Sequence, residues 1–174
     1  GNTTLCMASA VMGYKQTFGS DGPVGSYEDF SYADTIVLIG ANIADNHPIL
    51  KLHIAKNKKV TGKKPTIIVI DPRFSKTAKM ADIYVPLKPR SDLALMNGLC
   101  YIILEQGWED EKFIKERTTG YKEFRKHIIA NYKPQDVAEI TGIDVKDLYQ
   151  LAKVYAKSPA AMSAWTMGVN QSSI

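Results

Sequence analysis

Residues 35–39 read Thr-Ile-Val-Leu-Ile and stop at Gly40, and residues 66–70 read Thr-Ile-Ile-Val-Ile and stop at Asp71. Neither run alternates between apolar and polar residues, which is typical of strands that are buried on both faces of a parallel sheet. Residues 49–58, between the two runs, read as a helix. The stretch therefore predicts a strand, a crossover helix and a second parallel strand.

Further elements extend this βαβ unit. Residues 83–87 predict a third strand, whose Pro86 favours a position at a sheet edge or strand end, and residues 160–165 predict a last strand. Helices are expected over residues 7–18, 28–32, 110–117, 121–131, 134–140 and 144–157, and in a segment that begins at Ser91. We therefore expect an α/β fold with a Rossmann-like parallel sheet flanked by helices.

Composition excludes several classes of protein. A chain of 174 residues with 45% hydrophobic and 23% charged residues has the make-up of an ordinary globular protein rather than a disordered one. No apolar run approaches the roughly 18 residues needed to span a bilayer, so no membrane span is expected. The net charge of +4 is mild, and the clusters at 56–59 and 63–64 read as a solvated helix end and a turn. No nucleic-acid partner is therefore expected.

The two cysteines, Cys6 and Cys100, are too few for a disulfide framework or a four-cysteine metal site. Cys6 stands just ahead of the helix expected from residue 7, where a buried, inert thiol and a metal-binding thiolate are both open. Cys100 lies in the helix after Ser91, and the expected buried face of that helix carries Leu93, Met96, Cys100 and Ile103.

Candidate ligand-binding residues follow three of the expected strands, where an open parallel sheet binds its ligands. The segments are residues 40–46, 71–75 and 167–171. Asp71 can accept hydrogen bonds from a guanine edge, and Arg73 can stack on a base or pair with a phosphate. Neither Gly-x-Gly-x-x-Gly nor a P-loop motif is present. The residues alone thus indicate an α/β domain for a nucleotide-like ligand, with the alternative that Asp71-Pro72 only ends a strand and caps the next helix.

The sequence starts at Gly1 rather than Met, so we expect a piece of a longer protein. We divide it into residues 1–34, which hold Cys6 with a helix and a loop, and residues 35–174, the α/β ligand-binding domain. The two are expected to form one compact body.

Several short motifs occur in a specific order and spacing. They are Asn2 and residues 5–11, 18–23, 39–42, 47–48, 71–73, 81–82, 91–92 and 165–171. With these motifs, nearly the whole chain resembles the central domain of the molybdopterin-guanine-dinucleotide oxidoreductases, the multidomain molybdoenzyme family of nitrate reductases and formate dehydrogenases. The resemblance implies that residues 35–174 bind this dinucleotide.

In that family two pterin dithiolenes chelate molybdenum, and a Cys, selenocysteine or Ser side chain supplies one more ligand. The resemblance implies that Cys6 is this ligand, with Met7 beside it at the catalytic centre. It further implies that the cofactor, molybdenum bis-molybdopterin guanine dinucleotide, contacts Asn2, Gly40, Ala41, Asn42, Asp45, Asn46, Asp71, Pro72, Arg73, Ser75, Arg90, Ser91, Asp92, Met167, Gly168 and Gln171. Arg90 stands at a place that is often Gly in the family.

The residue after Cys6 favours one subfamily. Formate dehydrogenases usually carry His there as a proton acceptor, whereas this chain has Met7 and resembles assimilatory and periplasmic nitrate reductases. Residues 120–142 look equally like formate dehydrogenase. We therefore expect a nitrate reductase fragment, with a formate dehydrogenase and a non-catalytic cofactor-binding module as alternatives.

The resemblance also implies partners that this chain lacks. Nitrate or formate would be the substrate, and electrons would come from a donor protein through a [4Fe-4S] cluster in the parent protein, because this chain has too few cysteines to hold one. The isolated chain is expected to be inactive and empty of cofactor. The compartment stays open, with the cytoplasm favoured and the periplasm as the alternative.

Overall fold

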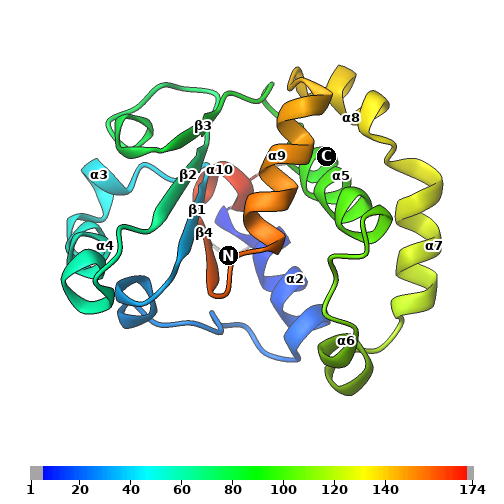
Figure 1. Cartoon of the computed structure of the whole chain (residues 1–174), viewed down its shortest axis with the longest axis horizontal. Helices are drawn as coiled ribbons and strands as arrows, with labels where there is room; N and C mark the ends of the chain where they lie inside the picture. The colour runs from blue at the N-terminus through cyan, green and yellow to red at the C-terminus, as the bar shows by residue number, and fades with distance from the viewer. Residues whose placement is uncertain (1–5, 172–174) are drawn as a thin grey trace. The chain divides into compact units, whose positions relative to one another are not determined.

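The computed structural model describes residues 6–171, and the contacts within the chain divide it into two compact units. The first unit holds residues up to 86 together with those from 159 onward, and the second holds residues 87–158 (Figure 1). The second unit is thus an insertion between two parts of the first. This division does not follow the boundary at residue 34 that we expected.

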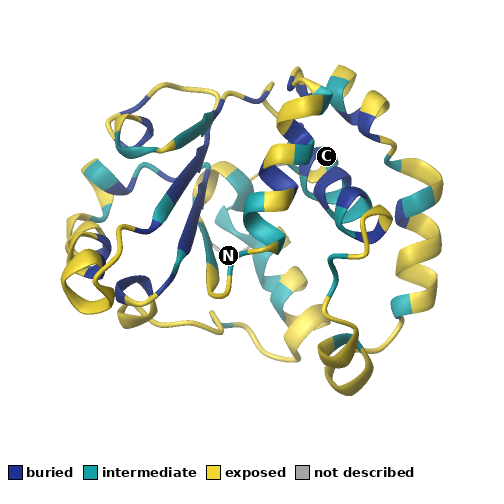
Figure 2. Ribbon diagram, viewed as in Figure 1, coloured by how far each residue is buried: buried dark blue, intermediate teal, exposed yellow. Residues whose placement is uncertain are grey.

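The first unit is built on a parallel sheet of four strands within the described residues. The strands are β1 (Thr35–Ile39), β2 (Thr66–Ile70), β3 (Ile83–Val85) and β4 (Ala161–Trp165), in the spatial order β3-β2-β1-β4. In the register, Thr35 of β1 lies opposite Thr66 of β2 and Ala161 of β4. All five residues of β1 are buried (Figure 2). The α/β fold expected from these strands is confirmed, and β3 is an edge strand that ends before Pro86.

Six helices of the first unit lie in the described residues. They are α2 (Ala8–Phe18), η1 (Glu28–Ser31), α3 (Ile43–Asn46), α4 (Pro48–Thr61), η2 (Ala78–Met80) and α10 (Met167–Asn170). The short helices α3, η2 and α10 lie in segments that we expected to be loops, because a helix of one turn leaves no periodic pattern in the sequence. Helix α4 continues past the expected end at Lys58 and stops at Gly62, whose φ of 77° makes a left-handed C-cap.

The core of the first unit joins the sheet to η1 and α4. Phe30, Ile36, Leu38, Ile54 and Ile67 belong to one cluster of buried apolar side chains. Asn57 of α4 is also buried, and its amide group donates hydrogen bonds to the carbonyl oxygens of Phe30 and Ala33 at 2.9 and 2.8 Å. A buried amide without partners is unfavourable, so these bonds fix α4 against the segment that precedes β1.

The second unit consists of α5 (Asp92–Glu105), α6 (Glu111–Arg117), α7 (Tyr121–Asn131), α8 (Pro134–Thr141) and α9 (Val145–Ala156), and α5 packs on α7, α8 and α9. The expected buried face of α5 is wrong, because Leu93 is 47% exposed while Leu95, Leu99 and Ile102 are buried. Helix α5 is apolar around most of its circumference, so spacing alone does not identify its inner face. Cys100 is half-buried, and this burial raises the pKa of its thiol.

No helix within residues 6–171 combines the length and the apolar character that a membrane crossing requires.

Candidate functional site

Three loops of the first unit meet at one edge of the sheet, because parallel strands all end on the same side. The loops begin at Gly40 after β1, at Asp71 after β2 and at Thr166 after β4. From β1 the chain moves to β2 and β3 on one side, whereas β4 lies on the other side of β1. The order therefore reverses between β1 and β4, which is where doubly wound sheets place their ligands.

The loops after β1 and β4 touch through their backbones. A Cβ atom built on Gly168 would lie 2.7 Å from both the Cα and the carbonyl oxygen of Gly40, which no real side chain tolerates. Gly40 itself has a φ of 53°, in the left-handed region that favours glycine. The Thr166 hydroxyl donates a 2.8 Å hydrogen bond to the Gly40 carbonyl oxygen, and the two loops are thereby joined.

Cys6 lies at the same end of β4, ahead of α2. Its thiol donates a weak hydrogen bond to Met167 Sδ at 3.7 Å, and Gln171 Nε2 donates to Cys6 Sγ at 3.9 Å. The ring of Tyr14 in α2 stacks on Trp165 with centroids 5.8 Å apart, which holds α2 beside the end of β4. The structure thus brings together three predicted site residues that lie far apart along the chain: Cys6, Met167 and Gln171. Met7, the N-cap of α2, is half-buried.

Asn170 is the last residue of α10, between Met167 and Gln171. Its side-chain oxygen Oδ1 is buried and has no hydrogen-bond partner in the structure of residues 6–171. A buried acceptor without a donor is unfavourable, and such groups occur at sites where a ligand or water supplies the donor.

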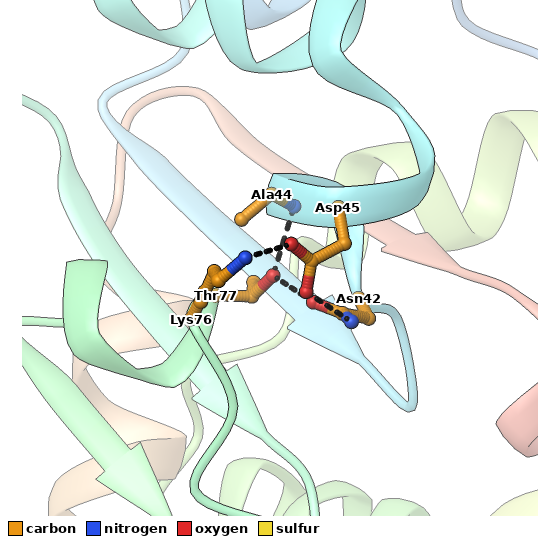
Figure 3. Close-up of polar contacts among 5 residues, drawn as sticks. All are labelled: Asn42, Ala44, Asp45, Lys76 and Thr77. Atoms are coloured by element: carbon orange, nitrogen blue, oxygen red, sulfur yellow. Dashed lines mark hydrogen bonds and ion pairs between the residues drawn. The ribbon is translucent and has the colours of Figure 1, made fainter.

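The loops after β1 and β2 are joined by a network of polar side chains (Figure 3). Asn42 Nδ2 donates to Asp45 Oδ2 at 2.9 Å, and Lys76 Nζ pairs with Asp45 Oδ1 at 2.7 Å. The hydroxyl of Thr77 donates to Asn42 Oδ1 at 3.0 Å. The hydrogen bonds from Lys76 and Asn42 lower the pKa of Asp45. Ala41 is buried in this loop, while Asn46 is exposed.

The segment after β2 forms a turn around Asp71. Asp71 is buried, and its Oδ1 accepts a 2.8 Å hydrogen bond from the backbone N–H of Arg73, while its carbonyl oxygen accepts one of 2.9 Å from the Tyr84 hydroxyl. Pro72 and Arg73 are exposed. At the start of the next helix, η2, the N–H of Ala78 donates a 3.3 Å hydrogen bond to Ser75 Oγ. Asp71 therefore stabilises its own turn and does not cap η2.

The remaining predicted contacts belong to the second unit or to residues that the structure does not describe. Arg90, Ser91 and Asp92 belong to the second unit, where the buried Ser91 donates its hydroxyl hydrogen to the Lys88 carbonyl oxygen at 2.6 Å. Arg90 has a φ of 68°, in the left-handed region that suits glycine better than arginine. Asn2 lies outside the described residues.

Protein side chains alone do not form a metal cage here. Residues 6–171 contain no group of three or more His, Cys, Asp or Glu side chains placed to hold a metal ion. Cys6 can therefore contribute one ligand to a metal whose other ligands come from a bound group or from outside these residues.

The sequence reasoning gave no site role to Lys76, Thr77 or Thr166, whereas Asn170 lies inside the predicted segment 167–171. Threonine is a common residue in turns, so residue type alone did not mark Thr77 or Thr166 as functional. One usable signal was their place, since each lies within a few residues of a segment already predicted to bind ligand.

Comparison with known proteins identifies the chain. A family model described as molybdopterin oxidoreductase matches residues 1–173. The chain belongs to this family. A molybdopterin oxidoreductase of similar sequence is a nitrate reductase from Symbiobacterium thermophilum, which is 40% identical over the whole of this chain and 24% of its own length.

Two further proteins are similar to this chain. Formate dehydrogenase H of Escherichia coli is 37% identical over 93% of this chain and 22% of its own length. The solved structure of acetylene hydratase from Pelobacter acetylenicus superposes with a TM-score of 0.82 at 26% identity, over 97% of this chain and 22% of that one. The chain therefore spans about a quarter of the length of these proteins.

Proposed function

We propose that this molybdopterin oxidoreductase chain is part of a nitrate reductase, and that it binds molybdenum bis-molybdopterin guanine dinucleotide and reduces nitrate to nitrite. The observation that carries the proposal is the convergence of Cys6, Met167 and Gln171 at the switch point of the sheet. A soft thiolate at that place suits a soft metal, and the ligand crevice of the fold lies beside it.

The residues present fit such a cofactor. Asn170 Oδ1 is buried and receives no hydrogen bond from residues 6–171, as is typical of a group whose donor comes from a ligand. Gly40 and Gly168 allow the loops after β1 and β4 to touch, so both loops reach the switch point beside Cys6. Asp71 and Arg73 lie at the end of β2, where a carboxylate and a guanidinium group suit a guanine base and a phosphate.

In this proposal each group of residues has its own role. Cys6 would ligate the metal through Sγ, and Gln171 would donate to that thiolate from the β4 side, with the Met167 side chain in contact with it. Gly40, Ala41, Asn42, Asp45 and Asn46 would line one cofactor half, and Asp71, Pro72, Arg73 and Ser75 would bind its guanine end. When bound, the molybdenum group supplies two-electron oxygen-atom transfer chemistry. A [4Fe-4S] cluster elsewhere in the parent protein would deliver the electrons.

Nitrate is favoured over formate by the chemistry around Cys6. The side chains that bond to Cys6 Sγ within residues 6–171 are Met167 and Gln171, and neither takes up a proton at neutral pH. Met7 follows Cys6 in the sequence and is likewise unable to act as a base. The formate dehydrogenase relative keeps formate oxidation as the second candidate.

The test uses the full-length parent protein and its Cys6→Ser variant, with Cys100→Ser as the matched control in the other unit. Metal content is measured by mass spectrometry, followed by nitrate-dependent oxidation of a reduced viologen and formate-dependent dye reduction. We expect molybdenum and nitrate turnover in the wild type and in Cys100→Ser, and loss of turnover in a folded Cys6→Ser protein. Formate turnover would establish the second candidate, and a folded parent without molybdenum or tungsten would establish a cofactor-binding module instead.

A further inference from the structure

Thr77 lies just before η2 and is fully buried, with an exposed fraction of 0%. A buried hydroxyl group requires hydrogen-bond partners, and Thr77 finds both of its partners in a different loop. It accepts from the backbone N–H of Ala44 at 3.0 Å and donates to Asn42 Oδ1 at 3.0 Å (Figure 3). Thr77 therefore connects the segment after β2 to the loop after β1.

The first of these bonds replaces a helix cap. Asn42 is the N-cap residue of α3, but its side chain makes no capping hydrogen bond. An N-cap side chain normally accepts from the second or third N–H of its helix, and Ala44 holds the second position. The Thr77 hydroxyl accepts from this N–H instead, so α3 is capped by a residue 33 positions away in the chain.

The second bond orients the Asn42 amide group. Because the single Thr77 hydroxyl hydrogen points at Oδ1, the Nδ2 group of Asn42 faces Asp45 and donates to it at 2.9 Å. Asp45 in turn pairs with Lys76, the chain neighbour of Thr77. Four side chains thus form a closed ring through two loops, as Figure 3 shows.

The members of this ring differ in burial. The Lys76 and Asp45 side chains are 72% and 39% exposed, so their ion pair is screened by water and contributes little. The two bonds of Thr77 are shielded from water on the Thr77 side. The connection between the loops therefore depends on the Thr77 hydroxyl.

We propose that Thr77 is a positioning residue that fixes the loop of Asn42 and Asp45 against the loop of Asp71 and Arg73, so that the two loops bind one cofactor together. The inference rests on the proposed function, since it assigns both loops to the same dinucleotide. Thr77 itself does not contact the cofactor in this proposal.

The experiment compares full-length wild type with Thr77→Val, Thr77→Ser and Lys76→Met. Thr141→Val is the matched control, because Thr141 is equally buried, donates to the Val137 carbonyl oxygen and accepts from the Ile143 N–H in the second unit. The readouts are the GMP released by acid hydrolysis of the purified protein, the rate of its loss on prolonged dilution, and the thermal unfolding midpoint.

We expect Thr77→Val to lose guanine nucleotide roughly tenfold to a hundredfold faster than wild type, the scale on which loss of a supporting hydrogen bond weakens a bound group. Thr77→Ser restores retention, and Lys76→Met stays within about twofold of wild type. Thr141→Val lowers the midpoint by a similar amount without faster nucleotide loss. Equal retention in Thr77→Val and wild type, or equal loss in Thr77→Val and Thr141→Val, would overturn the positioning role.

Ala44 and Asn42 are half-buried, so water can replace Thr77 as their partner and Thr77→Val is expected to fold. If it does not accumulate, Thr77→Ala decides the matter, since it removes the same hydroxyl but places no added methyl group against Ala44 and Asn42. Faster nucleotide loss supports the proposal and unchanged loss refutes it. A wild-type parent that yields no GMP would instead overturn the proposed function.

Discussion

The Thr166 hydroxyl donates a hydrogen bond to the carbonyl oxygen of Gly40 across 126 positions of sequence. It closes the switch point of the sheet from the β4 side, one residue before the Met167 that contacts Cys6. This bond therefore joins the loop after β1 to the segment that contacts Cys6.

Replacement of Thr166 by Val should lower the free energy of unfolding by about 1 kcal/mol, the usual net value of one such bond. Urea titration followed by Trp165 fluorescence in a Trp108→Phe background measures it, because the chain has two tryptophans. Thr166→Ser keeps the hydroxyl and should unfold close to wild type. Equal urea midpoints for Thr166→Val and the protein with Thr166 would show that the bond contributes nothing to stability.

Replacement of Gly168 by Ala should destabilise the first unit by roughly 1–3 kcal/mol, because the new Cβ meets the backbone of Gly40, which cannot rotate away. Gly13→Ala is the matched control: it lies within α2 with nothing within 4 Å of its added Cβ. That control should gain up to about 1 kcal/mol from helix propensity. The same urea titration compares both, and a neutral Gly168→Ala would contradict the close approach.

Asp82 should make stability depend on acid pH. Its burial works to raise the pKa, but hydrogen bonds from Lys64 and from the Ile67 N–H outweigh that effect and lower the pKa below the ordinary 3.8. The carboxylate therefore stabilises the fold above pH 3.8, and this stabilisation is lost as the pH falls below 3.8 through the folded-state pKa. The difference in unfolding free energy between wild type and Asp82→Asn should be constant at neutral pH and shrink in acid. A difference that persists undiminished in acid would refute this assignment.

Tyr149 should affect stability at alkaline pH. The hydrogen bond to the Glu105 carboxylate, with burial and the charge of Glu105, raises the pKa of Tyr149 to about 12 from its ordinary 10.0. Its contribution is complete below pH 10 and is lost as the pH rises toward 12. A phenolate absorbance titration of wild type minus Tyr149→Phe should show one group near pH 12, and Glu105→Gln should move that group toward its ordinary value. A group that titrates near pH 10 in the wild type would rule out the hydrogen bond in solution.

The strands β1 and β2 were predictable because each is a short, uninterrupted run of β-branched and aliphatic residues that is buried almost throughout. Thr35–Ile39 and Thr66–Ile70 have the bounds that the sequence predicts. The buried face of α5 was not predictable, since apolar residues surround that helix and the contact of Gly98 with Val137 selects the inner side. The insertion of residues 87–158 as a second unit also left no composition change at its ends.

For the candidate site, sequence reasoning found the loops but not the bonds between them. Asp71 and Arg73 were predictable as candidate site residues from their chemical type and from their place after a strand. Thr77 does not, because its importance comes from the two groups that approach it from residues 42 and 44, and those distances exist only in the folded chain. The cofactor contacts assigned to all of the predicted site residues stay predictions.

The insertion also sets an order of events during synthesis. β4 completes the sheet beside β1, yet residues 87–158 are made between them. The local helices of the second unit can fold early, because their contacts are close in sequence, whereas β1 waits with one edge unpaired until residue 165 has left the ribosome. Through that interval β1, an interior strand of the finished sheet, has an unpaired edge that can pair with a strand of another chain.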